Sequence, residues 1–208
     1  MLASQTIVGG LVVEPLTGPA LAASLDDVAN LRVTVFRDWP YLYEGSLDYE
    51  RRYISDFARA PDGVIVAARD EGRVVGIATG SPLLAHTRAF APLFAERGFD
   101  PERIFYCGES VLLPDYRGRG VGHAFFDLRE THADSLTSPA GPFTHAAFCG
   151  VVRSADDARS PAGYVPLDAF WRKRGYEKVD AMLGNFSWQE VGATAATDHP
   201  MQFWIKAL

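Results

Sequence analysis

The chain has 208 residues, of which 48% are apolar, 12% aromatic and 22% charged, a composition typical of a globular protein with one sizeable core. Its formal net charge of −6 argues against a surface that neutralises nucleic-acid phosphates or anionic lipid, so neither nucleic acid nor a membrane is an expected partner. No apolar run approaches the roughly 20 residues that cross a bilayer, and the first residues lack a secretory pattern, so we expect a soluble, cytoplasmic protein.

The chain opens with strand and helix signals. Residues 12–13 predict a strand. A helix is predicted next, because apolar residues recur at helical spacing along one stripe, namely Leu21, Leu25, Val28, Leu31 and Val35. Pro40 and Gly45 break this helix and leave an aromatic loop, after which a second helix is predicted over 47–60.

The next part of the chain predicts a hairpin and an insertion. Two β-rich runs, 63–68 and 73–78, are separated by a short polar turn and should be antiparallel neighbours. Residues 82–101 carry scattered aromatic residues and prolines, which indicates an insertion with one short helix around 90–97.

A βαβ unit is predicted in the second half. It comprises a strand over 104–113, a helix over about 120–135 and a strand over 143–152. The two strands should be parallel, because a right-handed helical crossover is the usual connection between parallel neighbours.

The last part of the chain predicts a short helix that ends at Gly175 and two strands, 178–188 and 202–205. The Ala/Thr-rich segment 192–197 is expected to be the loop between these strands. No internal repeat or domain boundary is evident, so residues 1–208 are expected to form a single domain.

A glycine-rich turn joins the predicted strand 104–113 to the helix that follows. Its sequence is Arg117-Gly118-Arg119-Gly120-Val121-Gly122-His123. At a helix N-terminus, free backbone N–H groups and the positive end of the helix dipole can hold an anion. The three glycines tolerate positive φ and permit close approach of a pyrophosphate, and the two arginines add positive charge.

Three other motifs fit these residues less well. A Walker A loop needs Lys followed by Ser or Thr, but His123 and Ala124 follow the last glycine. The dinucleotide fingerprint needs glycine in place of His123 and is best placed at the first strand-to-helix turn of a chain. The segment 108–110 resembles the start of a hydrolase nucleophile elbow, but the second glycine of that motif is replaced by Leu112, so Ser110 is not a convincing nucleophile.

The turn resembles the signature of the GNAT superfamily of N-acetyltransferases, (Q/R)-x-x-G-x-(G/A), at every fixed position. The preceding Pro114-Asp115-Tyr116 is similar to the approach that the family uses. Residues 169–176, AFWRKRGY, resemble its later A-x-x-F-Y-x-K-x-G-F element. The resemblance implies the GNAT fold, a mixed α/β fold in which a mostly antiparallel central sheet includes one parallel βαβ unit. It also implies that two strands splay apart at the cofactor site.

The resemblance also implies an activity, the transfer of an acetyl group from acetyl-coenzyme A to a small-molecule or peptide amine by direct attack. The amides of the turn would hold the pyrophosphate, and the preceding strand would pair with pantetheine, so that an N–H near Val111 or Leu112 faces the thioester oxygen. The cofactor-binding residues would be Ser110, Val111, Leu112, Arg117, Gly118, Arg119, Gly120, Val121, Gly122 and His123. A non-catalytic acyl-coenzyme A sensor and a transferase for a larger acyl group are the alternatives, and both a monomer and a homodimer are open.

Two residues are candidates for proton transfer. Glu109 precedes the turn, where a carboxylate could take a proton from the acceptor ammonium directly or through water; a partnered structural role is the alternative. The family usually supplies a tyrosine to protonate the departing thiolate, but this chain has Phe170-Trp171, and an indole is no useful acid. Tyr164 is the candidate substitute, with loop packing and unassisted thiolate departure as alternatives.

The loop after the first predicted helix falls where the family places its acceptor-binding loop. Substrate contact or surface packing is therefore expected for Arg37, Asp38, Tyr41, Tyr43 and Glu44. His145 and Arg153 flank a later strand and could point into the acceptor cleft or into solvent. Cys107 and Cys149 lie in apolar segments without a C-x-x-C spacing, so we expect buried thiols, and the histidines show no metal-ligand spacing, so no metal is expected.

Overall fold

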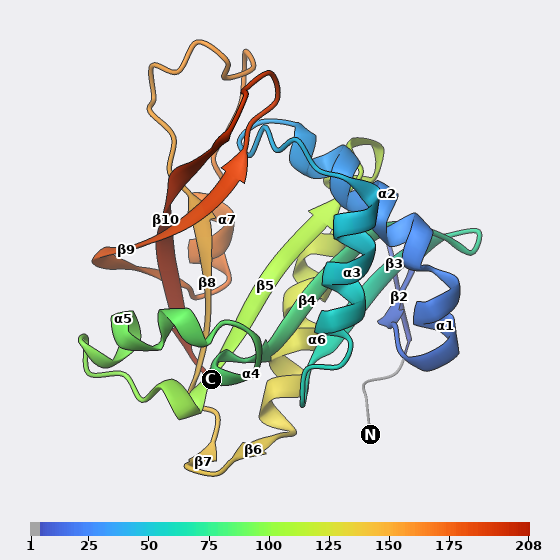
Figure 1. Cartoon of the computed structure of the whole chain (residues 1–208). Coiled ribbons are helices and arrows are strands. Elements are labelled where there is room, and N and C mark those ends of the chain that lie inside the picture. Colours follow the sequence, from blue (N-terminus) through green and yellow to red (C-terminus); the bar gives the residue numbers. More distant parts are fainter. Residues whose placement is uncertain (1–4) are drawn as a thin grey trace.

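The computed structural model describes residues 5–208, and its centre is an eight-stranded sheet with helices on both faces (Figure 1). The strand order is β1-β2-β3-β4-β5-β8-β10-β9, and the described strands pair antiparallel except for β5 with β8. The predicted mixed α/β architecture, with a mostly antiparallel sheet and one parallel pair, is confirmed.

The first part of the chain differs from the prediction. One strand was expected, but β1 (Thr6–Val8) and β2 (Leu11–Pro15) form a hairpin. The single predicted helix is divided into α1 (Gly18–Ala23) and α2 (Leu25–Arg37). Ser24 causes the division, because its φ of −104° and ψ of 2° are not helical and its hydroxyl donates to the Ala20 carbonyl at 2.8 Å.

The next three elements were predicted correctly. They are α3 (Leu47–Phe57), β3 (Val64–Asp70) and β4 (Arg73–Pro82), and the two strands form the expected antiparallel hairpin. Successive strand residues pack on opposite faces of the sheet. Ile65 joins the apolar cluster under α2 and α3, whereas Val66 joins the cluster on the opposite face, which the helix of residues 121–134 covers. Both faces are covered, which explains why these strands are apolar without alternation.

The insertion is more helical than predicted. It contains α4 (Leu83–His86), η1 (Arg88–Phe90), α5 (Ala91–Ala95) and η2 (Pro101–Arg103). Phe90 and Phe94 are buried, and their rings lie 5.1 and 5.3 Å from that of Phe203. The insertion is therefore part of the core on the α3 side of the sheet.

The βαβ unit is confirmed. Strand β5 (Ile104–Leu112) and the short η3 (Pro114–Tyr116) lead into α6 (Val121–Asp134), and a small hairpin of β6 (Thr137–Ser138) and β7 (Gly141–Pro142) precedes β8 (His145–Val151). Helix α6 lies on the face opposite to α2 and α3 (Figure 1).

The two parallel strands separate soon after they pair. Only three residue pairs are formed, from Ile104 with His145 to Tyr106 with Ala147. Beyond them, β5 stays with β4 and β8 stays with β10, so the strands diverge towards the top of Figure 1. This is the predicted splay.

The chain ends with α7 (Asp168–Lys173), β9 (Glu177–Gln189) and β10 (Ala196–Ala207). Strand β10 is longer than predicted and includes the end of the expected 192–197 loop. Its polar first half pairs with β9, for example Asp198 with Ser187, which the apolar pattern could not reveal. Within residues 5–208, no helix is long and apolar enough to cross a membrane.

Candidate active site

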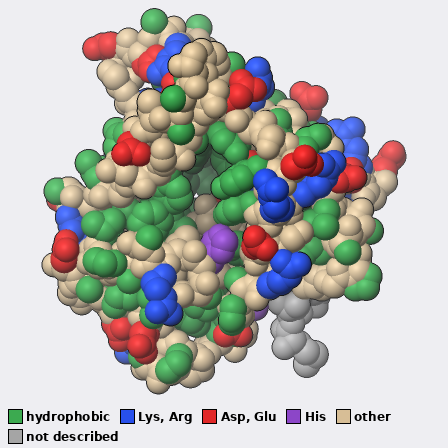
Figure 2. Space-filling model, in the orientation of Figure 1, with side chains coloured by type: hydrophobic (Ala, Val, Ile, Leu, Met, Phe, Trp, Pro, Cys, Tyr) green, Lys and Arg blue, Asp and Glu red, His purple; other side chains and the backbone are tan. Residues whose placement is uncertain are grey.

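A cleft opens between β5 and β8 where the strands separate. Figure 2 shows this face hollowed at its centre and lined with hydrophobic side chains, between the α2–α3 half and the β9–β10 half. The Leu113 amide donates to the Val75 carbonyl of β4 at 3.0 Å. Because inward and outward amides alternate along an antiparallel ladder, the Val111 amide also points to β4, whereas those of Ser110 and Leu112 point into the splay.

A β-bulge sits on β5 at the edge of this cleft. Thr79 pairs with Glu109 but Gly80 pairs with Cys107, so Gly108 is the extra residue. The buried guanidinium of Arg129, on α6, holds the residue pair on one side of the bulge, since it donates to the Thr79 and Glu109 carbonyls at 3.1 and 2.9 Å. Bulges bend a strand and re-aim its side chains, and this one directs Glu109 towards α2.

The glycine-rich turn has free donors. Within the described chain, the backbone amides of residues 118–122 have no hydrogen-bond acceptor, whereas the His123 amide donates to the Gly120 carbonyl at 3.0 Å. Gly118 and Gly120 have φ values of +75° and +87°. Gly122 lies in the first turn of α6 without positive φ, contrary to our expectation, and a Cβ there would lie 3.3 Å from the Phe170 ring. The turn therefore suits an anion.

The two arginines of the turn are exposed and lie at its rim. The Nε of Arg117 donates to the Leu112 carbonyl at 3.1 Å, and Nη2 of Arg119 donates to the Asp115 carbonyl at 2.8 Å. The β1–β2 hairpin packs on this turn, because a Cβ on Gly9 would lie 2.6 Å from the Cβ of Arg119. No pattern in the sequence indicated that the first strands support the candidate anion site.

Glu109 belongs to a buried cluster of charges. The Arg32 guanidinium, on α2, contacts the Glu109 carboxylate and lies 2.5 Å from that of Glu50, on α3. The three side chains are 7%, 6% and 0% exposed in that order. One oxygen of each carboxylate has no hydrogen-bond partner in the described residues. The cluster thus contains two carboxylates for one guanidinium and can accept a further cation or proton.

Sequence reasoning missed Arg32 and Glu50, although a signal existed. Arg32 falls on the apolar stripe of the first predicted helix, four residues after Val28. Glu50 falls on the apolar stripe of the second helix, four residues before Ile54. A charged residue on a buried stripe requires a partner, which is a reason to search for the opposite charge.

The candidate substrate-contact residues lie on or beside the loop between α2 and α3, here named the acceptor loop, and fall into two groups. Arg37 and Glu44 pair with each other at 2.6 Å near the surface, and Asp38 is exposed. Tyr41 and Tyr43 are partly buried. Burial raises the pKa of both hydroxyls, with Cys149 contributing at Tyr41 and Glu50 at Tyr43, so both tyrosines remain protonated.

The acceptor loop is joined to the β9–β10 hairpin, as the contact near the top of Figure 1 shows. The Val191 amide donates to the Leu42 carbonyl at 2.7 Å and the Glu44 amide to the Gln189 carbonyl at 2.8 Å. Arg153 reinforces this bridge: it pairs with Glu190 at 2.6 Å and donates to the Pro40 carbonyl at 2.6 Å. Arg153 thus connects the acceptor loop to the β9–β10 hairpin.

The cysteines differ in burial. Cys107 is buried as predicted, but Cys149 is only partly buried and its sulfur lies 3.0 Å from the Tyr106 hydroxyl, where the splay begins. Burial raises the pKa of the Cys149 thiol to about 12. Burial and the neighbouring Cys149 thiol raise the pKa of Tyr106.

The two candidate positions for a general acid lie in different surroundings. The Trp171 ring packs 5.0 Å from Phe148 and 5.1 Å from Trp204, so it belongs to the core between α7 and the sheet. Tyr164 is 39% exposed, and its ring lies 6.0 Å from that of Trp39 on the acceptor loop. Burial and the neighbouring Asp168 raise the pKa of Tyr164.

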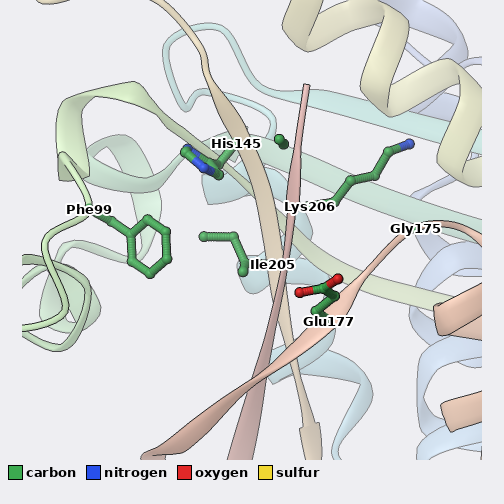
Figure 3. Close-up of a pocket in the computed structure, with 7 residues that line it drawn as sticks. Phe99, His145, Gly175, Glu177, Ile205 and Lys206 are labelled. Atoms are coloured by element: carbon green, nitrogen blue, oxygen red, sulfur yellow. The ribbon is translucent and has the colours of Figure 1, made fainter.

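His145 lies away from the cleft. It begins the paired end of β8, and it lines a separate pocket with Phe99, Ile205 and Glu177 (Figure 3). Its ring lies 3.0 Å from the Thr144 hydroxyl, and burial lowers its pKa. The described residues include no group of three or more side chains able to hold a metal ion.

Comparisons with known proteins agree with this geometry. Residues 28–140 match the model of the acetyltransferase (GNAT) family. The fold is similar to that of ribosomal-protein-alanine N-acetyltransferase from Brucella melitensis (18% identity, 94% of this chain and 99% of that chain, TM-score 0.58). It is also similar to Arabidopsis thaliana NAA60 in complex with acetyl-CoA (13% identity, 95% and 98%, TM-score 0.60). No curated protein matches the sequence.

Proposed function

The chain belongs to the GNAT acetyltransferase family and is an acyltransferase, and we propose that it moves the acetyl group of acetyl-coenzyme A to an amine. The observation that carries the proposal is the open splay between β5 and β8, which lies directly before the amides of residues 118–122, for which the described residues 5–208 provide no acceptor. The splay would receive an extended chain, and the amides that follow it would receive an anion.

The chain's own residues fit acetyl-coenzyme A. The free amides and the N-terminus of α6 suit a pyrophosphate, and Arg117 and Arg119 add charge at the rim. The outward amides of Ser110 and Leu112 suit an extended pantetheine chain. Acetyl-coenzyme A would supply a thioester whose carbonyl carbon the neutral amine attacks directly, so that an amide bond forms, the thiolate leaves and no acyl-enzyme is made.

Glu109 is the proposed base. An acceptor amine is an ammonium ion near neutral pH and must lose a proton before it attacks. The free carboxylate oxygen of Glu109 would take that proton directly or through one water, and Arg32 would hold the carboxylate in position. The Leu112 amide would stabilise the negative charge that develops on the carbonyl oxygen.

Tyr164 is the proposed acid, because Trp171 is packed in the core and has no acidic proton. Its raised pKa keeps the hydroxyl protonated, and its contact with Trp39 places it at the rim of the acceptor loop. Unassisted departure is the competing account, since a thiol with a pKa of roughly 8.5 is a tolerable leaving group.

Two measurements test the function together. Calorimetry should show binding of acetyl-coenzyme A, and a panel of amines should show release of free coenzyme A with at least one of them. Binding without release in any amine would instead indicate an acyl-coenzyme A sensor. Faster turnover with butanoyl-coenzyme A than with acetyl-coenzyme A would identify a transferase for a larger acyl group.

A further inference from the structure

Helix α6 buries an arginine that is held by neutral groups. Arg129 is only 1% exposed. Its hydrogen bonds within residues 5–208, at 2.9–3.1 Å, go to the carbonyls of Phe125, Thr79 and Glu109 and to the hydroxyl of Ser110. By contrast, Arg32 and Arg174, which are also largely buried, each contact two carboxylates. An arginine keeps its charge inside a protein, so burial without an opposite charge is unfavourable in itself. The reason for this residue therefore lies in what its guanidinium holds.

The guanidinium lies at the β5 bulge. A bulge interrupts the hydrogen bonds between two strands, so the backbone groups beside it need other partners. Nη1 donates to the Thr79 and Glu109 carbonyls, which belong to the residue pair next to the bulge, and Nη2 donates to Oγ of Ser110 at 3.0 Å. Because a guanidinium is a rigid, planar set of donors, these bonds fix both the position and the orientation of this short segment.

The position of the bulge determines the face to which Glu109 points. Cys107 packs in the apolar cluster under α6, but the Glu109 carboxylate contacts Arg32 on α2, which lies on the opposite face of the sheet (Figure 1). Two residues that are two apart share a face in a regular strand, and only the extra Gly108 separates these two. If the bulge moved to the other side of Glu109, the carboxylate would turn to the α6 face and leave Arg32.

We propose that Arg129 is a positioning residue for acetyl transfer: it fixes the bulge at Gly108 and thereby directs the Glu109 carboxylate to the α2 face. Its bonds to the Glu109 carbonyl and the Ser110 hydroxyl fit this position of the bulge. The inference rests on the proposed acetyl transfer and adds to it a residue on the opposite face of the sheet, which acts through Glu109 and not on the acceptor.

A double-mutant cycle tests the inference. Arg129→Lys keeps the charge but loses the planar set of donors, so we expect kcat for coenzyme A release to fall about tenfold. The acceptor is whichever of benzylamine, spermidine and a tetrapeptide with a free N-terminus the wild type uses fastest. In a Glu109→Gln background the same substitution should change kcat by less than about twofold, because Arg129 acts through Glu109. Equal losses in both backgrounds, or no loss in either, overturn the inference.

Carbon-13 NMR of the Glu109 carboxylate gives a readout that needs no turnover. The signal, assigned by its loss in Glu109→Gln, should shift in Arg129→Lys, because the carboxylate leaves the Arg32 guanidinium. The control is Arg174→Lys, since Arg174 is largely buried but binds Asp127 and Glu130 of α6, and it should leave the signal in place. An unshifted signal in folded Arg129→Lys would show that another group fixes the bulge.

A milder variant keeps the test decisive if Arg129→Lys does not fold. Ser110→Ala removes the hydroxyl that accepts from Nη2 and leaves the backbone and the guanidinium in place. We expect a smaller shift of the Glu109 signal and a fall in kcat of about threefold, which disappears in the Glu109→Gln background. Wild-type values of both quantities in Ser110→Ala would overturn the inference.

The outcomes separate the two proposals. Coenzyme A release by the wild type, together with an unshifted Glu109 signal in Arg129→Lys, refutes the positioning role and leaves acetyl transfer intact. No binding of acetyl-coenzyme A and no release with any of the three amines refutes acetyl transfer, and the NMR signal still decides whether Arg129 directs Glu109.

Discussion

The guanidinium of Arg32 contacts the carboxylate of Glu109, and both side chains are more than nine-tenths buried. Removal of the cation would leave Glu50 and Glu109 buried together without a counter-ion. We therefore expect Arg32→Gln to lower the free energy of unfolding by about 3–5 kcal/mol, measured by urea denaturation. The control is Arg51→Gln, which breaks exposed pairs with Asp26 and Asp48 and should lower the free energy of unfolding far less. Similar costs for the two variants would contradict a buried ion pair.

Substitution of the proposed base should affect turnover and spare the cofactor. Glu109→Gln keeps the shape of the side chain and removes the proton acceptor, so we expect turnover to fall by about 10²-fold and the Kd for acetyl-coenzyme A to stay the same. Glu50→Gln is the control, because Glu50 contacts the same arginine from α3. If the two variants lose activity equally, Glu109 has a structural role only.

The anion site can be tested at Gly120. Gly120→Glu places a carboxylate among the free amides and should abolish binding of acetyl-coenzyme A in calorimetry. The matched control is Gly72→Glu, because Gly72 has the same φ of +87° but lies in the β3–β4 turn. Both variants carry the backbone cost of a left-handed residue, about 1–2 kcal/mol. A Cβ on Gly120 would also lie 3.3 Å from Cγ1 of Val8, so the thermal midpoint of each variant is measured with its affinity. Unchanged affinity in folded Gly120→Glu would refute the assignment.

The role of Tyr164 can be tested by loss of its hydroxyl. Because its pKa is raised, the hydroxyl keeps its proton into the alkaline range, and an acid role predicts that Tyr164→Phe lowers turnover there by at least about tenfold. The affinity for acetyl-coenzyme A and the thermal midpoint should not change. Tyr49→Phe, at an exposed tyrosine on α3, controls for loss of a surface hydroxyl. Wild-type rates in Tyr164→Phe across the alkaline range would favour unassisted thiolate departure.

The pKa of about 12 at Cys149 predicts slow alkylation. At pH 8 about 10⁻⁴ of this thiol is ionised, and that fraction grows about tenfold for each pH unit up to the pKa. The rate of iodoacetamide modification at Cys149, followed by mass spectrometry, should therefore rise without a plateau between pH 8 and 11. A plateau near pH 9 would show an ordinary, solvated thiol.

The sequence predicted those elements whose patterns are local. The hairpin of β3 and β4 and the unit from β5 to β8 have continuous apolar runs bounded by turns, and the glycine-rich turn depends on neighbours along the chain. The first half of β10 was not predictable in this way, because Asp198 and His199 interrupt the apolar pattern and are held by pairing with β9.

The cluster around Glu109 depends on tertiary structure. Arg32 and Glu50 lie far from Glu109 in sequence, and their meeting requires α2 and α3 to pack on the face of β5 to which the Gly108 bulge directs Glu109. The bridge from the acceptor loop to β9 likewise depends on tertiary structure. No local sequence pattern specifies that the loop between α2 and α3 meets the β9–β10 hairpin.

The splay between β5 and β8 also bears on the risk of strand-to-strand aggregation. An unpaired strand edge can recruit a strand from another molecule, and proteins usually shield or interrupt such edges. Here the unpaired edge of β5 lies in the middle of the sheet, and β8 remains attached to it at one end through three residue pairs. A narrow, extended small molecule can enter that gap, but a second folded chain cannot bring its own strand and flanking side chains into it. The protein can therefore keep a free backbone edge ready for a ligand without exposing it to aggregation.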